Sequence, residues 1–169
     1  MIVRLADRVL KTKFGVFTEV LYYDGQRESI ALVMGDVGDG ENVLCRIHSA
    51  CIGGHVFNSV ECECAAEMSA AQKAVHENGR GVIIYLDQEG KGNGHLALIE
   101  SMKYKQGFGQ AEAYVRAGFS ADARDYRPAA EILSEMGVRS VVLLTSNPEK
   151  SSELERRSMI VSETRNIFE

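Results

Sequence analysis

The sequence predicts one α/β domain over residues 1–169, built from antiparallel strands followed by alternating strands and helices. A length of 169 residues suits a single domain, and only two prolines and no linker-like or repeated segment interrupt the chain. The first third contains runs of β-branched and aromatic residues between glycine-containing turns. The remainder alternates short apolar runs with alanine-rich or amphipathic segments, which is the pattern of βα units.

The N-terminal third is expected to form three strands. Residues 15–23 and 29–35 are rich in β-branched and aromatic side chains, and Asp24-Gly25 between them is a turn signal. A second turn region precedes residues 42–48, which form the third apolar run. Because short turns join consecutive runs, we predict an antiparallel meander of these three strands.

Buried strands and helices alternate through the rest of the chain. Short apolar runs predict strands at 81–86, 139–145 and 159–163. The segments with helical character lie at 62–77, 95–106, 111–117, 127–136 and 148–157.

Capping residues mark the ends of these helices. Asn78-Gly79 is a typical helix C-terminus, and Gly107 ends the second helix. Asp125 and Asn147 are expected to be N-caps, since each is followed by a proline within the first helical turn.

The composition excludes several classes of protein. Hydrophobic residues make up 45% and charged residues 25% of the chain, which argues against disorder or a fibrous repeat. The net charge of −5 argues against a nucleic acid polymer as partner. No apolar run has membrane-spanning length, and charges interrupt residues 1–8 where a signal peptide would be apolar. We therefore expect no membrane partner and a cytoplasmic location.

The strongest chemical signal is Cys51-x10-Cys62-x-Cys64. Clustered cysteines in a reducing compartment favour metal ligands or catalytic groups over disulfides. Three ligands with an open position are typical of a catalytic zinc. Two alternatives remain: a structural site completed by a neighbouring histidine or the fourth cysteine, or small buried residues that bind no metal.

A glycine-rich loop follows the strand predicted at 81–86. Gly90, Gly92 and Gly94 precede a helix, and Lys91 adds a positive charge. Such a loop lets backbone amides approach an anion, although an ordinary strand–helix turn explains the glycines equally well.

Two further segments combine capping residues with charges. Asp122 and Arg124 lie two residues apart before a helix, and a surface ion pair is their simplest explanation. Residues 145–150 follow a predicted strand at the sheet edge where α/β proteins bind ligands. Helix capping accounts for Asn147 but leaves Lys150 unexplained.

Six ordered blocks of this chain together resemble the GTP cyclohydrolase II family, zinc enzymes that open riboflavin biosynthesis. The blocks are Arg-Ile-His-Ser-Ala-Cys (46–51), Cys-Glu-Cys (62–64), Gly-Arg-Gly-Val-Ile-Ile-Tyr (79–85), Gln-Glu-Gly-Lys (88–91), Gly-Phe-Ser-Ala-Asp-Ala-Arg-Asp-Tyr (118–126) and Leu-Leu-Thr-Ser-Asn-Pro-Glu-Lys (143–150). The resemblance runs from about residue 9 to residue 163 and implies the family's α/β fold.

The resemblance implies a hydrolase that opens the purine ring of GTP at C8 and releases pyrophosphate. The product would be a ring-opened ribosylaminopyrimidinone 5′-phosphate. In the family, one Zn²⁺ per chain activates the attacking water, Mg²⁺ accompanies the substrate, a second water releases formate, and the protein is a homodimer.

The family's functional residues fall on positions of this chain. Its zinc ligands fall on Cys51, Cys62 and Cys64, its general base on Asp122, and the arginine that acts at the α-phosphate on Arg124. The positions expected to contact the substrate are Arg46, His48, Ser49, Glu67, Glu89, Gly90, Lys91, Gln110, Thr145 and Lys150.

The chain departs from the family pattern around the base and the phosphates. The family's catalytic tyrosine falls on Met102, which has no proton to donate, and Tyr104 would lie about 200° around the helix from that site. Lys91 replaces an arginine and loses bidentate geometry, Glu67 replaces a glutamine and Gln110 replaces a threonine. The family's C-terminal tail is also longer.

These departures favour an altered enzyme. Because the zinc ligands, the base and Arg124 are all present, we expect C8 attack to occur and the second hydrolysis to be impaired at Met102, so that the product keeps its formyl group. One alternative is a paralogue that uses a different purine nucleotide. The other is a non-catalytic protein that binds nucleotides or is stabilised by zinc.

Overall fold

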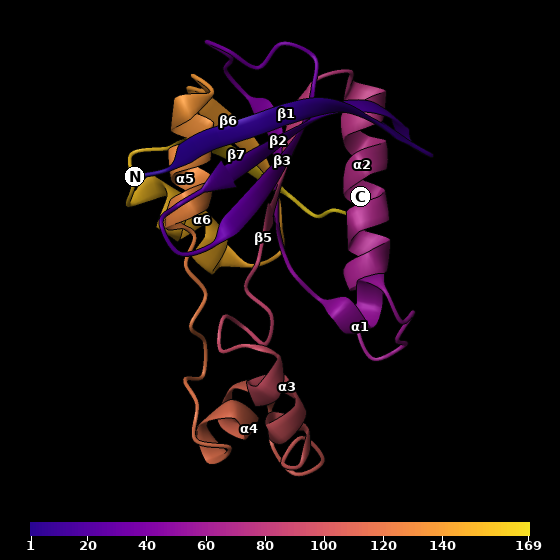
Figure 1. The fold of residues 1–169 in the computed structure, drawn as a ribbon, viewed down its shortest axis with the longest axis vertical. Helices are drawn as coiled ribbons and strands as arrows, with labels where there is room; N and C mark the ends of the chain where they lie inside the picture. The colour runs from indigo at the N-terminus through magenta and orange to yellow at the C-terminus, as the bar shows by residue number, and fades with distance from the viewer.

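The computed structural model describes residues 1–169 and contains one seven-stranded mixed sheet flanked by helices (Figure 1). The strands are β1 (Val3–Thr12), β2 (Gly15–Tyr23), β3 (Glu28–Met34), β4 (Val43–Ser49), β5 (Gly81–Leu86), β6 (Ser140–Leu144) and β7 (Ile160–Arg165). The helices are α1 (Ile52–His55), α2 (Cys64–Asn78), α3 (His95–Met102), α4 (Gln110–Arg116), α5 (Arg127–Glu135) and α6 (Pro148–Glu155).

The strand order is β1-β2-β3-β5-β4-β6-β7. The strands β1, β2, β3 and β5 pair antiparallel in that order, whereas β5, β4, β6 and β7 are mutually parallel. The predicted α/β class is confirmed. The predicted meander is wrong in its third strand, because β4 lies between β5 and β6. Six of the seven residues of β4 are buried, which suits a central parallel strand better than a hairpin partner.

Two elements were not predicted from the sequence. The edge strand β1 pairs with β2 although its side chains are almost all exposed, because charged residues interrupt the apolar ones. The short helix α1 follows β4 and is a single turn containing two glycines. The other predicted elements are present, most with boundaries shifted by one to three residues.

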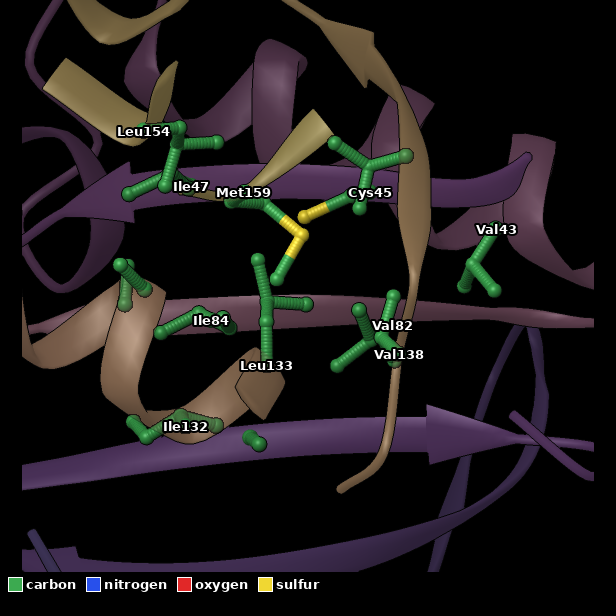
Figure 2. Close-up of a cluster of buried hydrophobic side chains, with 14 of the residues drawn as sticks. Val43, Cys45, Ile47, Val82, Ile84, Ile132, Leu133, Val138, Leu154 and Met159 are labelled. Atoms are coloured by element: carbon green, nitrogen blue, oxygen red, sulfur yellow. The ribbon is translucent and has the colours of Figure 1, made fainter. Parts of the chain in front are cut away.

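Helices cover both faces of the sheet (Figure 1). On one face, a 20-residue core joins the sheet to α5 and α6. Figure 2 shows part of it, with Cys45 and Ile47 of β4 beside Leu133 of α5 and Leu154 of α6. On the other face, α2 contributes Ala71 and Val75 to a smaller core.

The helix ends largely follow the predicted capping residues. Gly79 ends α2 with φ +73°, and the Asn147 side chain accepts a hydrogen bond from the Glu149 N–H at the start of α6 (3.0 Å). Asp125 is a correction, because Tyr126 occupies the N-cap position of α5. The Asp125 carboxylate still accepts the Arg127 N–H (2.8 Å), so it stabilises the same turn from one residue earlier.

Helix α3 is shorter than predicted and ends at Met102. The next amides bond to carbonyls only three residues back, as the Tyr104 N–H does to the Ser101 carbonyl (3.0 Å), and this tightens the chain into turns before α4. Helices α3 and α4 pack on each other and project beyond the sheet (Figure 1).

The carboxyl ends of β4, β5 and β6 lie side by side because these strands are parallel neighbours. The segments that leave these ends carry the cysteine, glycine-loop and Thr145–Lys150 motifs. None of the helices is long and apolar enough to cross a membrane.

Candidate functional site

Three cysteine thiols converge beyond the end of β4. Cys51 lies just after β4, and Cys62 and Cys64 lie at the start of α2. Their Sγ atoms all lie within 4.8 Å of one another, and those of Cys51 and Cys62 are 3.6 Å apart. A Cβ at Gly54 would be only 2.9 Å from the Cys62 Sγ, so the glycine of α1 keeps this space open.

The electrostatics of the cluster fit a bound cation. Burial raises the pKa of Cys51 and of Cys64, whereas a hydrogen bond from the Cys64 backbone lowers the pKa of Cys62. Thiols this close repel one another once ionised, and a cation among them removes that cost. Three sulfur donors form a soft ligand set that suits Zn²⁺. The cysteine cluster therefore fits a metal ion.

A cavity of about 270 Å³ adjoins the cysteine cluster. The predicted site residues that line it are Ser49, Cys51, Cys62, Cys64, Glu89, Gly90, Lys91, Met102, Gln110 and Arg124. We call this space the cysteine-side cavity. It brings together residues from four separate motifs of the sequence.

The glycine-rich loop forms one wall of the cysteine-side cavity. Gly90 has φ +60°, and a Cβ there would lie 2.2 Å from the Gly94 carbonyl oxygen, so only glycine fits. Lys91 also has a positive φ of +52°, and its carbonyl accepts the Ala123 N–H (2.8 Å). The Glu89 carboxylate accepts the N–H of Ile52 (2.9 Å). Glu89 thus ties the loop to α1 as well as facing the cavity.

Two buried cations lie on β4 and α6 and bond to the backbone of neighbouring strands. Arg46 of β4 donates to the Leu144 carbonyl (3.0 Å) and to the Glu67 carboxylate of α2 (2.6 Å). Lys150 of α6 donates to the Ile47 carbonyl (2.9 Å). We call Arg46 and Lys150 the cationic cluster.

The cationic cluster is held at high electrostatic cost. Lys150 is 7% exposed, and burial together with the charges of Arg46 and Arg124 lowers its pKa to about 8. Arg46 is 4% exposed, and its Nε atom has no hydrogen-bond partner. Buried cations with incomplete pairing are typical of sites that bind anions.

Asp122 and Arg124 form a tight ion pair through several hydrogen bonds, including one from Arg124 Nε to Asp122 Oδ1 of 2.9 Å. Burial alone would raise the pKa of Asp122, but the hydrogen bonds from Arg124 outweigh burial and the pKa is lowered. Arg124 also lines a second cavity of about 380 Å³ together with Asp122, Tyr126 and Glu149. Arg124 therefore lies between the two cavities.

Four expected substrate contacts are buried in the structure and line neither cavity, namely Arg46, His48, Thr145 and Lys150. His48 is 2% exposed, and its Nε2 lies 2.9 Å from the Nε2 of His55. Burial, reinforced by Arg46, lowers the pKa of His48 to about 3 and keeps its ring neutral. The Thr145 hydroxyl accepts the Asn147 N–H (3.0 Å), so it shapes the turn before α6.

The positions around Met102 include one residue that sequence reasoning missed. Met102 lines the cysteine-side cavity, whereas Tyr104 lies past the end of α3 and does not. Tyr114 of α4 lines the same cavity and is 1% exposed. The only sequence signal was a tyrosine within a short helix, which gives no indication of a cavity.

The fold and site define an α/β protein with a cysteine cluster suited to a metal ion and buried cations suited to an anion. The sequence model of the family GTP cyclohydrolase II matches residues 3–166. The chain therefore belongs to the GTP cyclohydrolase II family, as the resemblance predicted.

Named relatives and one solved structure are similar to the chain. A GTP cyclohydrolase-2 of Neisseria meningitidis is 44% identical over 156 residues, covering 91% of this chain and 79% of the relative. A riboflavin biosynthesis protein RibBA of Bacillus cereus is 40% identical over 166 residues. That match covers 96% of this chain, which spans only 42% of the relative's length.

The solved structure is that of RibBX from A. baumannii, described as a two-domain 3,4-dihydroxy-2-butanone 4-phosphate synthase. It aligns with a TM-score of 0.55 and 16% identity, covering 98% of this chain and 39% of that chain. At this identity the likeness concerns the fold alone, and it agrees with the mixed α/β architecture.

Proposed function

We propose that the protein hydrolyses the purine ring of GTP at C8, releases pyrophosphate and yields a ring-opened ribosylaminopyrimidinone 5′-phosphate that keeps its formyl group. The observation that carries this proposal is the cavity shared by three converging thiols and Arg124, in a chain that belongs to the GTP cyclohydrolase II family. Among the residues that line this cavity, the three thiols suit a metal ion, and Lys91 and Arg124 suit phosphate.

The cofactors in this proposal are one Zn²⁺ per chain and Mg²⁺ with the substrate. Cys51, Cys62 and Cys64 would hold the zinc, since their thiols converge and are not joined by disulfides. The chemistry that zinc supplies in a three-ligand site is Lewis-acid activation of water.

The cationic cluster and Lys91 would bind the triphosphate. In the free protein, Arg46 is paired with Glu67 and Arg124 with Asp122, so the phosphates compete with carboxylates for both guanidinium groups. Planar guanidinium groups bind phosphate oxygens in a bidentate manner. Lys150 is already buried, and a phosphate beside it would stabilise its charged form.

Movement of Arg124 toward the α-phosphate would change the chemistry of Asp122. The hydrogen bonds from Arg124 hold the Asp122 pKa down, which makes the carboxylate a weak base in the free protein. When these bonds are exchanged for bonds to phosphate, the pKa rises and an Asp122 oxygen can accept a proton from the attacking water. Substrate binding would in this way activate the base.

The formyl group would be retained because Met102 has no acidic hydrogen where the cavity approaches α3. The second hydrolysis needs a group that orients or protonates the formamide, and the thioether of Met102 does neither. The product therefore keeps the carbon that the first hydrolysis has freed from the ring.

The test is to incubate zinc-loaded protein with GTP and Mg²⁺, and then to combine mass spectrometry with a formate assay. The formylated product with pyrophosphate and no formate is the expected result. The deformylated diaminopyrimidine with stoichiometric formate would contradict formyl retention but not C8 hydrolysis. Unchanged GTP would contradict the proposal, and a panel of purine nucleotides would then separate an altered substrate from a binding role.

We also infer a cytoplasmic homodimer. The dimer is what the resemblance to the GTP cyclohydrolase II family implies, and Leu96, Phe57 and Val60, which are 67%, 72% and 98% exposed, are apolar side chains available for a contact. Sedimentation velocity that shows only monomer at micromolar concentration would contradict the dimer.

A further inference from the structure

The side chain of Gln88 joins two segments of the site. Gln88 follows β5, lines the cysteine-side cavity and is 4% exposed. Its Oε1 accepts the backbone N–H of Asp125 (2.9 Å), and its Nε2 donates to the hydroxyl of Ser49 (3.1 Å). Because a backbone N–H can only donate, the Asp125 contact fixes the orientation of the amide and turns its NH₂ group toward Ser49.

The two partners of Gln88 belong to the segments that carry the cysteine cluster and the Asp122–Arg124 ion pair. Ser49 ends β4, two residues before Cys51. Asp125 lies in residues 118–126, which we call the Asp122 loop. The partners are 39 and 37 residues from Gln88 along the chain. One buried side chain therefore connects regions that no local interaction could hold together.

The Asp122 loop depends on such contacts for its position. It contains no helix or strand, because it lies between α4 and α5. Before Asp122, the Asn93 side chain donates to the Ser120 carbonyl (3.0 Å) and accepts the Ser120 N–H (3.2 Å). After the ion pair, Gln88 holds the other end of the loop. Of these two side chains, only Gln88 also bonds to the segment that leads to the cysteine cluster.

We propose that Gln88 is a positioning residue whose side-chain amide holds the Asp122 loop in a fixed place relative to the thiols of the cysteine cluster. This inference rests on the proposed function, because it takes Asp122 as the base and the thiols as metal ligands. The amide acts through its two protein partners, since both its oxygen and its nitrogen are bonded within the chain. A primary amide suits this role because it donates at one end and accepts at the other.

Removal of the amide would release the Asp122 loop at one end. Gln88→Met keeps the length of the side chain and makes neither hydrogen bond. Because a displacement of about 1 Å costs about a hundredfold in rate, we expect kcat to fall by about tenfold to a hundredfold. The cationic cluster and Lys91 lie outside the loop, so the Kd of the nucleotide should rise by at most about threefold.

The experiment compares the zinc-loaded parent protein with Gln88→Met and with Ser140→Ala. Ser140 is the matched control, because it is also buried and accepts a backbone N–H, that of Asn42 (2.8 Å). It begins β6 and so lies at the end of that strand remote from the site. Hydrogen–deuterium exchange reports local opening. Calorimetric titration with the α,β-methylene analogue of GTP gives the Kd and the binding-competent fraction, and assays with GTP give kcat per competent chain.

The expected results separate positioning from stability. Both variants lose a buried hydrogen bond, so both should melt at a lower temperature than the parent. Gln88→Met alone should exchange faster in residues 118–126 and lose kcat, with unchanged zinc content. Ser140→Ala should exchange faster around Asn42 and keep the kcat of the parent.

Three results would overturn the inference. An unchanged kcat in Gln88→Met, with a parent that turns over GTP, would show that Gln88 does not position the base and would leave the proposed function standing. A Kd raised as much as kcat is lowered would make Gln88 a binding residue instead. A parent protein that neither binds the analogue nor converts GTP would reject the proposed function and this inference with it.

A measurement on the parent protein keeps the inference testable if Gln88→Met does not fold. The Asp125 amide should exchange slowly in the parent, because Gln88 accepts its hydrogen. The Ala121 amide of the same loop has no acceptor in the structure and is the reference for fast exchange. Equal exchange rates at Asp125 and Ala121, measured by NMR, would contradict the contact on which the inference depends.

Discussion

The cysteine cluster and the cationic cluster are the two poles of the site, and they are built differently. The Sγ atoms of the three thiols lie within 4.8 Å of one another, at a cavity that Lys91 and Arg124 also line. The cations Arg46 and Lys150 are buried among backbone carbonyls and, for Arg46, beside a carboxylate. The difference teaches that, in the proposed function, the thiols receive their cation from outside the chain, whereas Arg46 is partly neutralised within it and would exchange partners to bind phosphate.

The largest expected effect comes from removing one thiol of the cysteine cluster. If the proposed function holds, we expect Cys62→Ser to lose zinc binding and all detectable turnover, because an alcohol is a far weaker zinc ligand than a thiolate. Metal analysis by mass spectrometry and a GTP assay measure both. Cys45→Ala is the matched control, since Cys45 is a buried core residue of β4 that should alter stability but not metal content. Equal zinc content in Cys62→Ser and the parent would contradict the metal site.

The next effect tests how much the buried charge of Lys150 in the cationic cluster destabilises the folded protein. In the folded protein, the pKa of Lys150 is lowered to about 8, below its value in the unfolded chain. The buried charge therefore destabilises the folded protein fully below pH 8. This destabilisation decreases as the pH rises above 8 and is gone above the pKa of the unfolded chain. We expect Lys150→Met to stabilise the protein at pH 7 by roughly 2 kcal/mol, after allowing for the lost bond to Ile47. The same variant should raise the KM for GTP.

Urea unfolding at pH 7 and at pH 9.5 measures this effect and its sign. The gain in stability from Lys150→Met should shrink at the higher pH, because the parent lysine is then largely neutral. Lys73→Met is the matched control, an exposed lysine of α2 for which we expect no change at either pH. A loss of stability at pH 7 would show that the bond to the Ile47 carbonyl outweighs the burial of the charge.

The sequence predicted the convergence of the cysteine cluster better than the arrangement of the cationic cluster. The spacing of the cysteines lies within one short segment, so the thiol cluster could be expected before the fold was known. The pairing of Arg46 with Glu67 joins β4 to α2, and the burial of Lys150 depends on how α6 packs. The place of Tyr114 in the lining of the cysteine-side cavity depends on the contact between α3 and α4, which no local pattern specifies.

The fold, too, could be predicted only as far as local sequence patterns determine it. Helix and strand positions followed from local periodicity and capping residues, as Asn147 at the start of α6 illustrates. The place of β4 between β5 and β6 did not, because strand order is decided by which surfaces are buried together. The edge strand β1 was missed because pairing with β2 stabilises it although its own side chains are mostly exposed.

A smaller change concerns the product of the reaction and is made at Met102 of the cysteine-side cavity. We expect Met102→Tyr to place a phenol in the cysteine-side cavity and to release formate from GTP. The formate assay measures the ratio of formate to pyrophosphate, which should rise from near zero toward one. Met102→Leu is the control for side-chain volume and should release none. No formate from Met102→Tyr would mean that position 102 does not determine the product.

The smallest expected effect tests whether Arg46 of the cationic cluster exchanges the Glu67 carboxylate for phosphate. Glu67 is part-exposed and bonds the buried Arg46, so in the proposed function its carboxylate would compete with the triphosphate for that guanidinium. Glu67→Gln keeps a hydrogen-bond acceptor and removes the charge, and we expect the KM for GTP to fall by about twofold to fivefold, the range of a partly solvated ion pair. Glu163→Gln, which removes the exposed partner of Arg165 on β7, is the matched control and should leave KM unchanged. If Glu67→Gln instead raises KM, the Glu67 carboxylate holds Arg46 in position for phosphate. Arg46 would then be preorganised, as the converging thiols are, and would not exchange its partner when GTP binds.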